Sequence, residues 1–185
     1  MFAAIFLWFS ASASAAEDQH PMAFGKNHIA LELTQSFPTS FSQNDFEPDH
    51  AHPAFAYRHF MDQNWFMGVA FGYRIWKRRT TEAGQNKQVA IWSITHETFR
   101  LMRLYHPTYL AGGLRLHYLN PTQSATLPLV RDEQLETEMG AALSIMLMHQ
   151  TGSGTASFRI DRWRGLDTMI LHGIEVGLGY HYALD

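Results

Sequence analysis

The chain has 185 residues, about one domain's worth, of which 46% are hydrophobic, 14% aromatic and 17% charged. That much apolar and aromatic surface can form a packed core, so the composition excludes a disordered protein. Cysteine is absent, which excludes disulfide scaffolds and thiolate metal sites. The net charge of −3 gives no basic field that would attract nucleic acid.

Residues 1–16 have the layout of a secretory signal peptide. An apolar block from Phe2 to Phe9 is followed by a run of small residues that ends at Ala16. The stretch is shorter than the roughly 20 apolar residues of a membrane-spanning helix, and its small residues suit a signal-peptidase site. We therefore expect residues 1–16 to be cleaved and residues 17–185 to form one exported domain.

The rest of the chain alternates between large apolar residues and small or polar ones with a period of two, which indicates β-strands. In the clearest segment, residues 65–75, six large apolar side chains from Trp65 to Ile75 share one face, and Phe, Gly, Ala and Arg occupy the other. The pattern predicts eight strands, at residues 27–34, 53–61, 65–75, 88–104, 108–119, 135–147, 155–163 and 170–182.

The two faces of these strands favour a membrane barrel. A face of Gly, Ala and isolated charges suits the crowded interior of a small barrel, whereas an all-apolar face suits lipid. A closed barrel also pairs every backbone group without water, as a membrane requires. A soluble barrel of the lipocalin type is the alternative fold. We expect the aromatic residues near strand ends to form interfacial girdles, namely Trp65, Tyr73, Tyr109, Tyr118, Tyr180 and Tyr182.

The connections between the predicted strands alternate in length. Three are short, at residues 62–64, 106–107 and 151–154. The others are longer, at residues 35–52, 78–87 and 120–133, with a more modest one near 164–168. Outer-membrane barrels have short periplasmic turns and long extracellular loops. This alternation therefore predicts that both termini lie on the periplasmic side.

The alternation of residues and of connection lengths is clearest in residues 65–76, 109–118 and 171–182. In this pattern the chain resembles the small eight-stranded outer-membrane β-barrels of the OmpA membrane-domain and OmpX type. The resemblance covers essentially all of residues 27–182 and lies in pattern rather than in a signature motif. It implies an all-β, eight-stranded, antiparallel, transmembrane up-and-down barrel. Such proteins typically end in a strand with an aromatic residue that the barrel-assembly machinery recognises; Tyr180 and Tyr182 have that parity.

Strand parity places a set of charged residues inside the predicted barrel. Because a buried charge is destabilising by several kcal/mol unless it is compensated, we expect these residues to form a salt-bridge network that fills the lumen. A narrow gated pore that uses the same groups is the alternative. The predicted lumen charges are Glu32, Arg58, Arg74, Arg115, Glu136, Glu138, Arg159, Asp161 and Glu175.

Basic and aromatic residues gather where two predicted strands reach the long-loop side. Guanidinium groups bind phosphate in bidentate fashion, and tryptophan anchors at the membrane interface. The cluster therefore suggests contact with lipopolysaccharide phosphates, and an ordinary solvated rim is the alternative. It comprises Lys77, Arg78 and Arg79, which follow Trp76, and Arg162, Trp163 and Arg164.

Two further groups give weak signals. The first long connection holds carboxylates and imidazoles, but their spacing matches no defined metal site. They are Asp45, Glu47, Asp49, His50 and His52. On residues 88–104, Ser93, Thr95 and Glu97 share one face while His96 points the other way, so no serine–histidine pair with an orienting acid forms there. We predict no metal site and no catalytic residues from these groups.

The sequence thus predicts an integral outer-membrane protein of a Gram-negative bacterium with a structural or surface-interaction role, such as membrane integrity, adhesion or lipopolysaccharide contact. A lipid A-modifying enzyme and a narrow gated pore are the alternatives. We expect a monomer without cofactor whose partners are outer-membrane lipid, lipopolysaccharide and, during biogenesis, the barrel-assembly machinery.

Overall fold

The structure, a computed structural model, describes residues 27–39, 46–48, 50–62, 64–78, 88–122, 137–151, 154–166 and 172–184. The predicted signal peptide, residues 1–16, lies outside these ranges. Within them no helix is long and apolar enough to cross a membrane. The described chain forms β1 (Asn27–Pro38), β2 (Phe46–Pro48), β3 (His52–Phe60), β4 (Trp65–Arg78), β5 (Gln88–Tyr105), β6 (Thr108–Thr122), β7 (Glu138–Thr151), β8 (Gly154–Gly165) and β9 (His172–Ala183).

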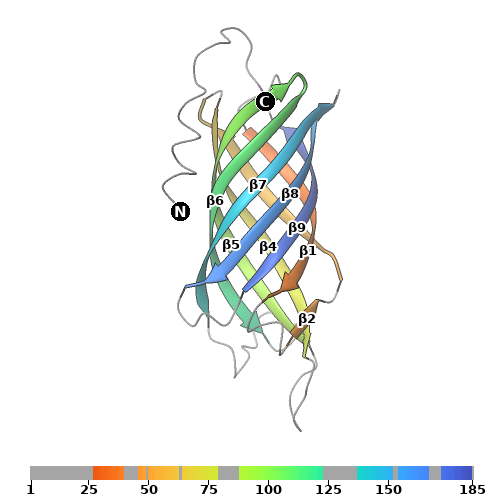
Figure 1. The fold of residues 1–185 in the computed structure, drawn as a ribbon, viewed down its shortest axis with the longest axis vertical. Helices are drawn as coiled ribbons and strands as arrows, with labels where there is room; N and C mark the ends of the chain where they lie inside the picture. The colour runs from red at the N-terminus through yellow and green to blue at the C-terminus, as the bar shows by residue number, and fades with distance from the viewer. Residues whose placement is uncertain are drawn as a thin grey trace.

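The eight predicted strands are all present, and together they form a closed antiparallel barrel (Figure 1). Each long strand pairs with the next one along the chain, β4 with β5 included, and β9 pairs with β1 to close the wall. The three-residue strand β2 is an addition that the alternation did not predict. It pairs with the end of β4, from Trp76 to Arg78.

The connections have the predicted alternation of lengths. Only residues 61–64, 106–107 and 152–153 separate β3 from β4, β5 from β6 and β7 from β8; the second connection contains a cis peptide bond before Pro107. The connections at the other end are longer. Figure 1 shows the end of β9 beside the β5–β6 hairpin, at the upper end of the view. We refer to the two ends as the short-turn end and the long-loop end.

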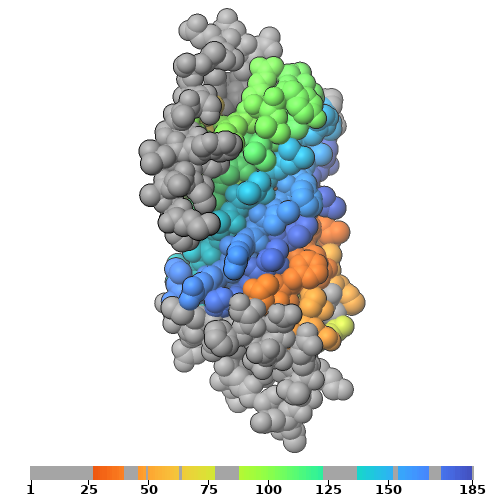
Figure 2. Space-filling view, viewed as in Figure 1, coloured from red at the N-terminus to blue at the C-terminus, as the bar shows by residue number. Residues whose placement is uncertain are grey.

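Burial alternates along the strands as the period of two predicts. On β4, Val69 and Phe71 are 37% and 51% exposed, whereas Ala70 and Arg74 are buried. The same alternation runs along β7 and β8. The predicted orientation of β4 is therefore confirmed. Large apolar side chains are exposed on the outer face of the barrel, among them Leu31, Ile145 and Leu178. Figure 2 shows side chains of β7, β8, β9 and β1 as slanting bands that lie side by side across one part of this outer surface.

The lumen is filled by side chains in three layers. An apolar layer at the short-turn end contains Phe60, Phe66, Phe99, Leu101, Tyr109, Ala111, Met146 and Met148. A second apolar layer at the long-loop end contains Phe46, Trp76, Val89, Ile91, Leu119, Ala142 and Trp163. Charged residues lie between these two layers. The expectation that Tyr109 belongs to an interfacial girdle was wrong, because its ring points inward and is 2% exposed.

Candidate functional site

Six charged side chains form an alternating ring of ion pairs across the middle of the lumen. Arg58 Nε lies 2.5 Å from Glu97 Oε1, and Arg58 Nη2 lies 2.6 Å from Glu32 Oε1. The remaining links use Arg115 with Glu97 at 3.3 Å, Arg115 with Asp161, Arg159 with Asp161 at 2.8 Å, and Arg159 with Glu32. The ring connects β1, β3, β5, β6 and β8, so it links opposite walls of the barrel.

Glu175 on β9 adds a fourth carboxylate and joins Arg74 to this ring. Its Oε1 lies 2.8 Å from Arg159 Nη2 and 3.4 Å from Arg115 Nη1, and its Oε2 lies 2.7 Å from Arg74 Nε. The network therefore contains four arginines and four carboxylates, all at most 6% exposed. Equal numbers of opposite charges at such buried positions compensate one another, which offsets much of the penalty of burying them.

Small residues in the wall make room for the network. Ala30, Ala56 and Ala70 stand side by side on β1, β3 and β4 and are at most 4% exposed. At Gly68 on β4, a Cβ would lie 2.8 Å from Glu97 Oε1 and 3.0 Å from Arg58 Cγ. Any larger residue at this position would displace the ion pair, so the glycine is needed for a close approach.

Two arginines of the charged layer contact aromatic side chains of the apolar layers on either side. Arg58 lies over the ring of Phe66 at 5.8 Å, toward the short-turn end. Arg74 lies over Trp163 at 4.8 Å, toward the long-loop end. Both arrangements allow a cation–π attraction, which is stronger where water is excluded.

The structure brings most of the predicted lumen charges together. Seven of them, Glu32, Arg58, Arg74, Arg115, Arg159, Asp161 and Glu175, are members of the network just described. Glu138 is also buried, but its carboxylate lies against Gly165 at the long-loop end. Glu136 lies outside the described residues.

Sequence reasoning missed Glu97, which completes the ring, and the buried histidines around it. Glu97 has the same parity as Ser93 and Thr95, so the signal was present in the sequence. His181 Nε2 lies 3.0 Å from Arg58 Nη1. His117 is buried and its Nδ1 lies 2.9 Å from the hydroxyl of Thr95.

The predicted basic cluster at the long-loop end is only partly as expected. Arg162 and Arg164 are exposed on the outer face of β8, and Lys77 is half-buried on the outer face of β4. Arg78 ends β4, and Arg79 lies outside the described residues. The prediction that Trp163 belongs to this cluster was wrong, because its indole points into the lumen and is 1% exposed. It packs against Trp76 at 5.7 Å, so neither indole can anchor at the membrane interface.

The groups with weak signals show no site in the described ranges. Asp45 and Asp49 lie outside those ranges, and within them no group of three or more potential ligands gathers. His52 begins β3 and is buried, while Glu47 on β2 and His50 are exposed. Ser93, Thr95 and Glu97 point inward and His96 points outward, as parity predicts.

The structure does contain a serine–histidine pair that the sequence search missed. Ser157 Oγ lies 2.9 Å from His181 Nε2. However, both residues are buried in the lumen, and the histidine is next to the Arg58 guanidinium rather than an orienting carboxylate. A catalytic pair needs an acid partner and access for substrate. This pair therefore belongs to the packing of the lumen.

Comparisons with known proteins reveal the fold. No family model and no curated protein matches the chain. Among solved structures, Ail of Yersinia pestis in complex with the heparin analogue sucrose octasulfate matches with 11% identity and a TM-score of 0.53, over 86% of this chain and 99% of that one. Neisserial surface protein A matches with 11% identity and a TM-score of 0.56, over 85% and 97%.

OprG from Pseudomonas aeruginosa matches with 9% identity and a TM-score of 0.55, over 89% of this chain and 99% of that one. At these identities the likeness concerns the fold alone. The resemblance drawn from the sequence pattern is confirmed at that level: the chain has the fold of the small eight-stranded outer-membrane β-barrels.

Proposed function

We propose that the protein is an integral outer-membrane barrel of a Gram-negative bacterium with a structural or surface-interaction role, and that its long-loop end contacts lipopolysaccharide. The observation that carries the membrane part is the exposure of large apolar side chains around the whole barrel. They occur on every long strand, from Leu31 on β1 to Tyr182 on β9. A soluble protein rarely exposes so continuous an apolar surface, whereas a bilayer requires one.

The exposed cations on β8 support the lipopolysaccharide part of the proposal. Arg162 and Arg164 stand on the outer face, near the end of the strand and close to the long loops. The contact between Trp76 and Trp163 brings the ends of β4 and β8 to the same level of the barrel. Lys77 therefore lies at this end as well. Guanidinium groups form strong charge-assisted hydrogen bonds with phosphate.

A structural neighbour adds independent support. Ail of Yersinia pestis, which has the same fold, was crystallised with sucrose octasulfate, a heparin analogue. A barrel of this size can therefore bind a small polyanion. The phosphates of lipopolysaccharide would present comparable negative charge to Arg162 and Arg164.

Thermal unfolding in detergent, with and without added lipopolysaccharide, tests this contact. We expect lipopolysaccharide to raise the unfolding temperature of the wild type, and R162Q/R164Q to lose most of that rise. Adding Arg78→Gln and Arg79→Gln should remove more. The matched control R100Q/R103Q removes two arginines near the short-turn end and should keep the full rise. An equal loss of stability with and without lipopolysaccharide would show that the β8 arginines are structural.

The enzyme alternative has its own test. Mass spectrometry of lipid A from cells with and without the protein should give the same acylation and phosphorylation pattern. A change in that pattern would replace the structural role with an enzymatic one.

A further inference from the structure

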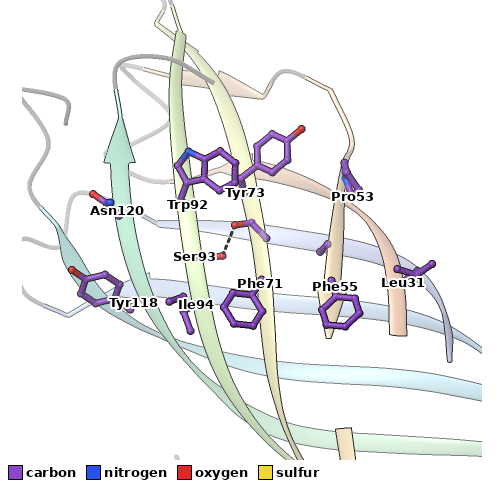
Figure 3. Close-up of a pocket in the computed structure, with 12 residues that line it drawn as sticks. Leu31, Pro53, Phe55, Phe71, Tyr73, Trp92, Ser93, Ile94, Tyr118 and Asn120 are labelled. Carbon is purple, nitrogen blue, oxygen red and sulfur yellow. Dashed lines mark hydrogen bonds between the residues drawn. The ribbon is translucent and has the colours of Figure 1, made fainter. Parts of the chain in front are cut away.

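The outer wall of the barrel contains a hollow of about 430 Å³ over β3, β4 and β5 (Figure 3). Its volume is within the range of roughly 300–1,000 Å³ typical of small-molecule sites. Figure 3 shows outward-facing apolar side chains in a row across it, with the stacked rings of Tyr73 and Trp92, 4.9 Å apart, on its long-loop side. The row consists of Tyr118, Ile94, Phe71, Phe55 and Leu31.

The hollow lies where two neighbouring strands separate. β3 and β4 pair over six positions, from Phe60 opposite Phe66 to Phe55 opposite Phe71. Beyond this point, residues 52–54 of β3 pair with β1 only. Residues 72–75 of β4 pair with β5 only, until β2 joins β4 at Trp76. The wall therefore has a local interruption in its backbone ladder within the membrane-spanning part of the barrel.

A second, smaller cavity lies on the inner side of the same interruption. Its volume is about 10 Å³, enough for one water-sized group. The two cavities share five lining residues, and three of these, Ala54, Gly72 and Ser93, are small. The wall between the lipid-facing hollow and the charged lumen is therefore thin beside these small residues.

Arg74 lines the inner cavity and has spare hydrogen-bonding capacity. It is 4% exposed, and its Nε faces Glu175 at 2.7 Å. Its Nη1 has no hydrogen-bond partner among the residues that the structure describes. Arg115 and Arg159 line the same cavity. A buried guanidinium with an unused N–H favours an anionic acceptor.

We propose that this wall binds a single-chain amphiphile with a carboxylate head, that is, a fatty acid. The hydrocarbon tail lies in the outer hollow, which is continuous with the lipid-facing surface and lined by apolar side chains. The carboxylate enters between β3 and β4 beside Gly72, where one of its oxygens accepts a hydrogen bond from Arg74 Nη1. The inner cavity has room for one oxygen atom of the head group, so this geometry favours a compact carboxylate over a bulkier phosphodiester.

Tryptophan quenching in detergent micelles tests the proposal, with 9,10-dibromostearate as the ligand and 9,10-dibromostearyl alcohol as its uncharged counterpart. Trp92 lines the hollow, whereas Trp76 and Trp163 are buried in the lumen and Trp65 begins β4 at the short-turn end. The signal from the site is the quenching that Trp92→Phe abolishes. We expect this signal to saturate, and the acid to reach half-saturation at a concentration about tenfold lower than the alcohol, or lower still.

Two variants locate the head group. Arg74→Gln removes the charge, and Gly72→Ala adds a methyl group to the thin wall, 3.3 Å from Ala54 Cβ and 3.8 Å from Ser93 Oγ. Each should reduce the preference for the acid to about onefold while the alcohol still binds. Arg103→Gln, an exposed arginine near the short-turn end, should leave the preference unchanged. If Arg74→Gln fails to fold, the acid-over-alcohol preference of Gly72→Ala decides whether the head group binds at this position.

Equal affinity of the wild type for acid and alcohol would overturn the head-group assignment, and quenching that rises linearly without saturation would overturn the site itself. A preference that persists in both variants would also contradict the proposal. The inference rests on the proposed membrane insertion but not on the lipopolysaccharide contact. The two fail separately, because the lipopolysaccharide test depends on Arg162 and Arg164.

Discussion

Arg58 is held by three partners at once, so its removal should disturb the lumen strongly. It contacts Glu97, Glu32 and His181 and is fully buried. Removing it leaves two carboxylates facing each other with less positive charge, in an interior where an uncompensated charge is destabilising by several kcal/mol. Substituting this one residue therefore measures how strongly the buried charges of the network compensate one another.

We expect Arg58→Met to lower the free energy of unfolding by about 3–5 kcal/mol. The double variant R58M/E97L should be no less stable than R58M, because it restores equal numbers of positive and negative charges. Glu32 still has its ion pair with Arg159 in this variant. Urea unfolding in lipid vesicles, followed by tryptophan fluorescence, measures both. Strict additivity of the two single changes would show that Arg58 and Glu97 do not interact.

At the scale of the element, β4 offers a test of which environment its outer face meets. Val69 is opposite Tyr57 on β3 and His96 on β5, all on the outer face. Near the midplane, Val69→Arg should lower the free energy of unfolding by about 2–4 kcal/mol, because the cation is forced into hydrocarbon. The same urea experiment in vesicles provides the measurement.

Ile75→Arg is the matched control for this prediction. Ile75 lies on the same face of β4 but six residues nearer the long-loop end, where the cost falls to about 0–1 kcal/mol. Equal effects of the two substitutions would argue against a lipid-facing surface on β4. In that case the soluble-barrel alternative would regain support.

The sequence predicts β4 and most other strands because period-two alternation is a local property. The same parity places the lumen charges, since a strand that is buried on one face has a strongly specified orientation. Two assignments failed for an identifiable reason. Trp163 and Tyr109 lie near strand ends, where aromatic residues often face the interface, but their parity along the strand turns both rings into the lumen.

Other features depend on contacts that are distant in the sequence. The strand β2 has three residues and is defined by its pairing with β4, so no local sequence pattern predicts it. The separation of β3 from β4 depends on register. Pro53, which has no backbone N–H to donate, is its only local signal.

At the scale of the whole molecule, the two apolar layers close the charged lumen at both ends. We therefore expect no steady ionic conductance when the purified protein is inserted into a planar bilayer. An eight-stranded barrel is only just wide enough to hold its own side chains. Reproducible single-channel openings would contradict this prediction and revive the gated-pore alternative.

The closed barrel also makes a prediction for gel electrophoresis. Unboiled protein in dodecyl sulfate should keep its barrel and migrate differently from boiled protein, because every long strand pairs on both sides over most of its length. Identical mobility in both states would indicate a fold that detergent disrupts at room temperature, as expected of a soluble barrel.

The ring of ion pairs also bears on how the protein reaches its final state. Arg159 and Glu32 are 127 positions apart, and Arg58 and His181 are 123 apart. These partners meet only after β9 has docked against β1. A sheet that stalls one strand short of completion therefore has an open edge and unneutralised charge at the same time, and hydrocarbon disfavours both. In this chain the last hydrogen bonds of the wall and the last ion pairs of the lumen depend on the same docking of β9 against β1, so we expect membrane insertion and barrel closure to be coupled.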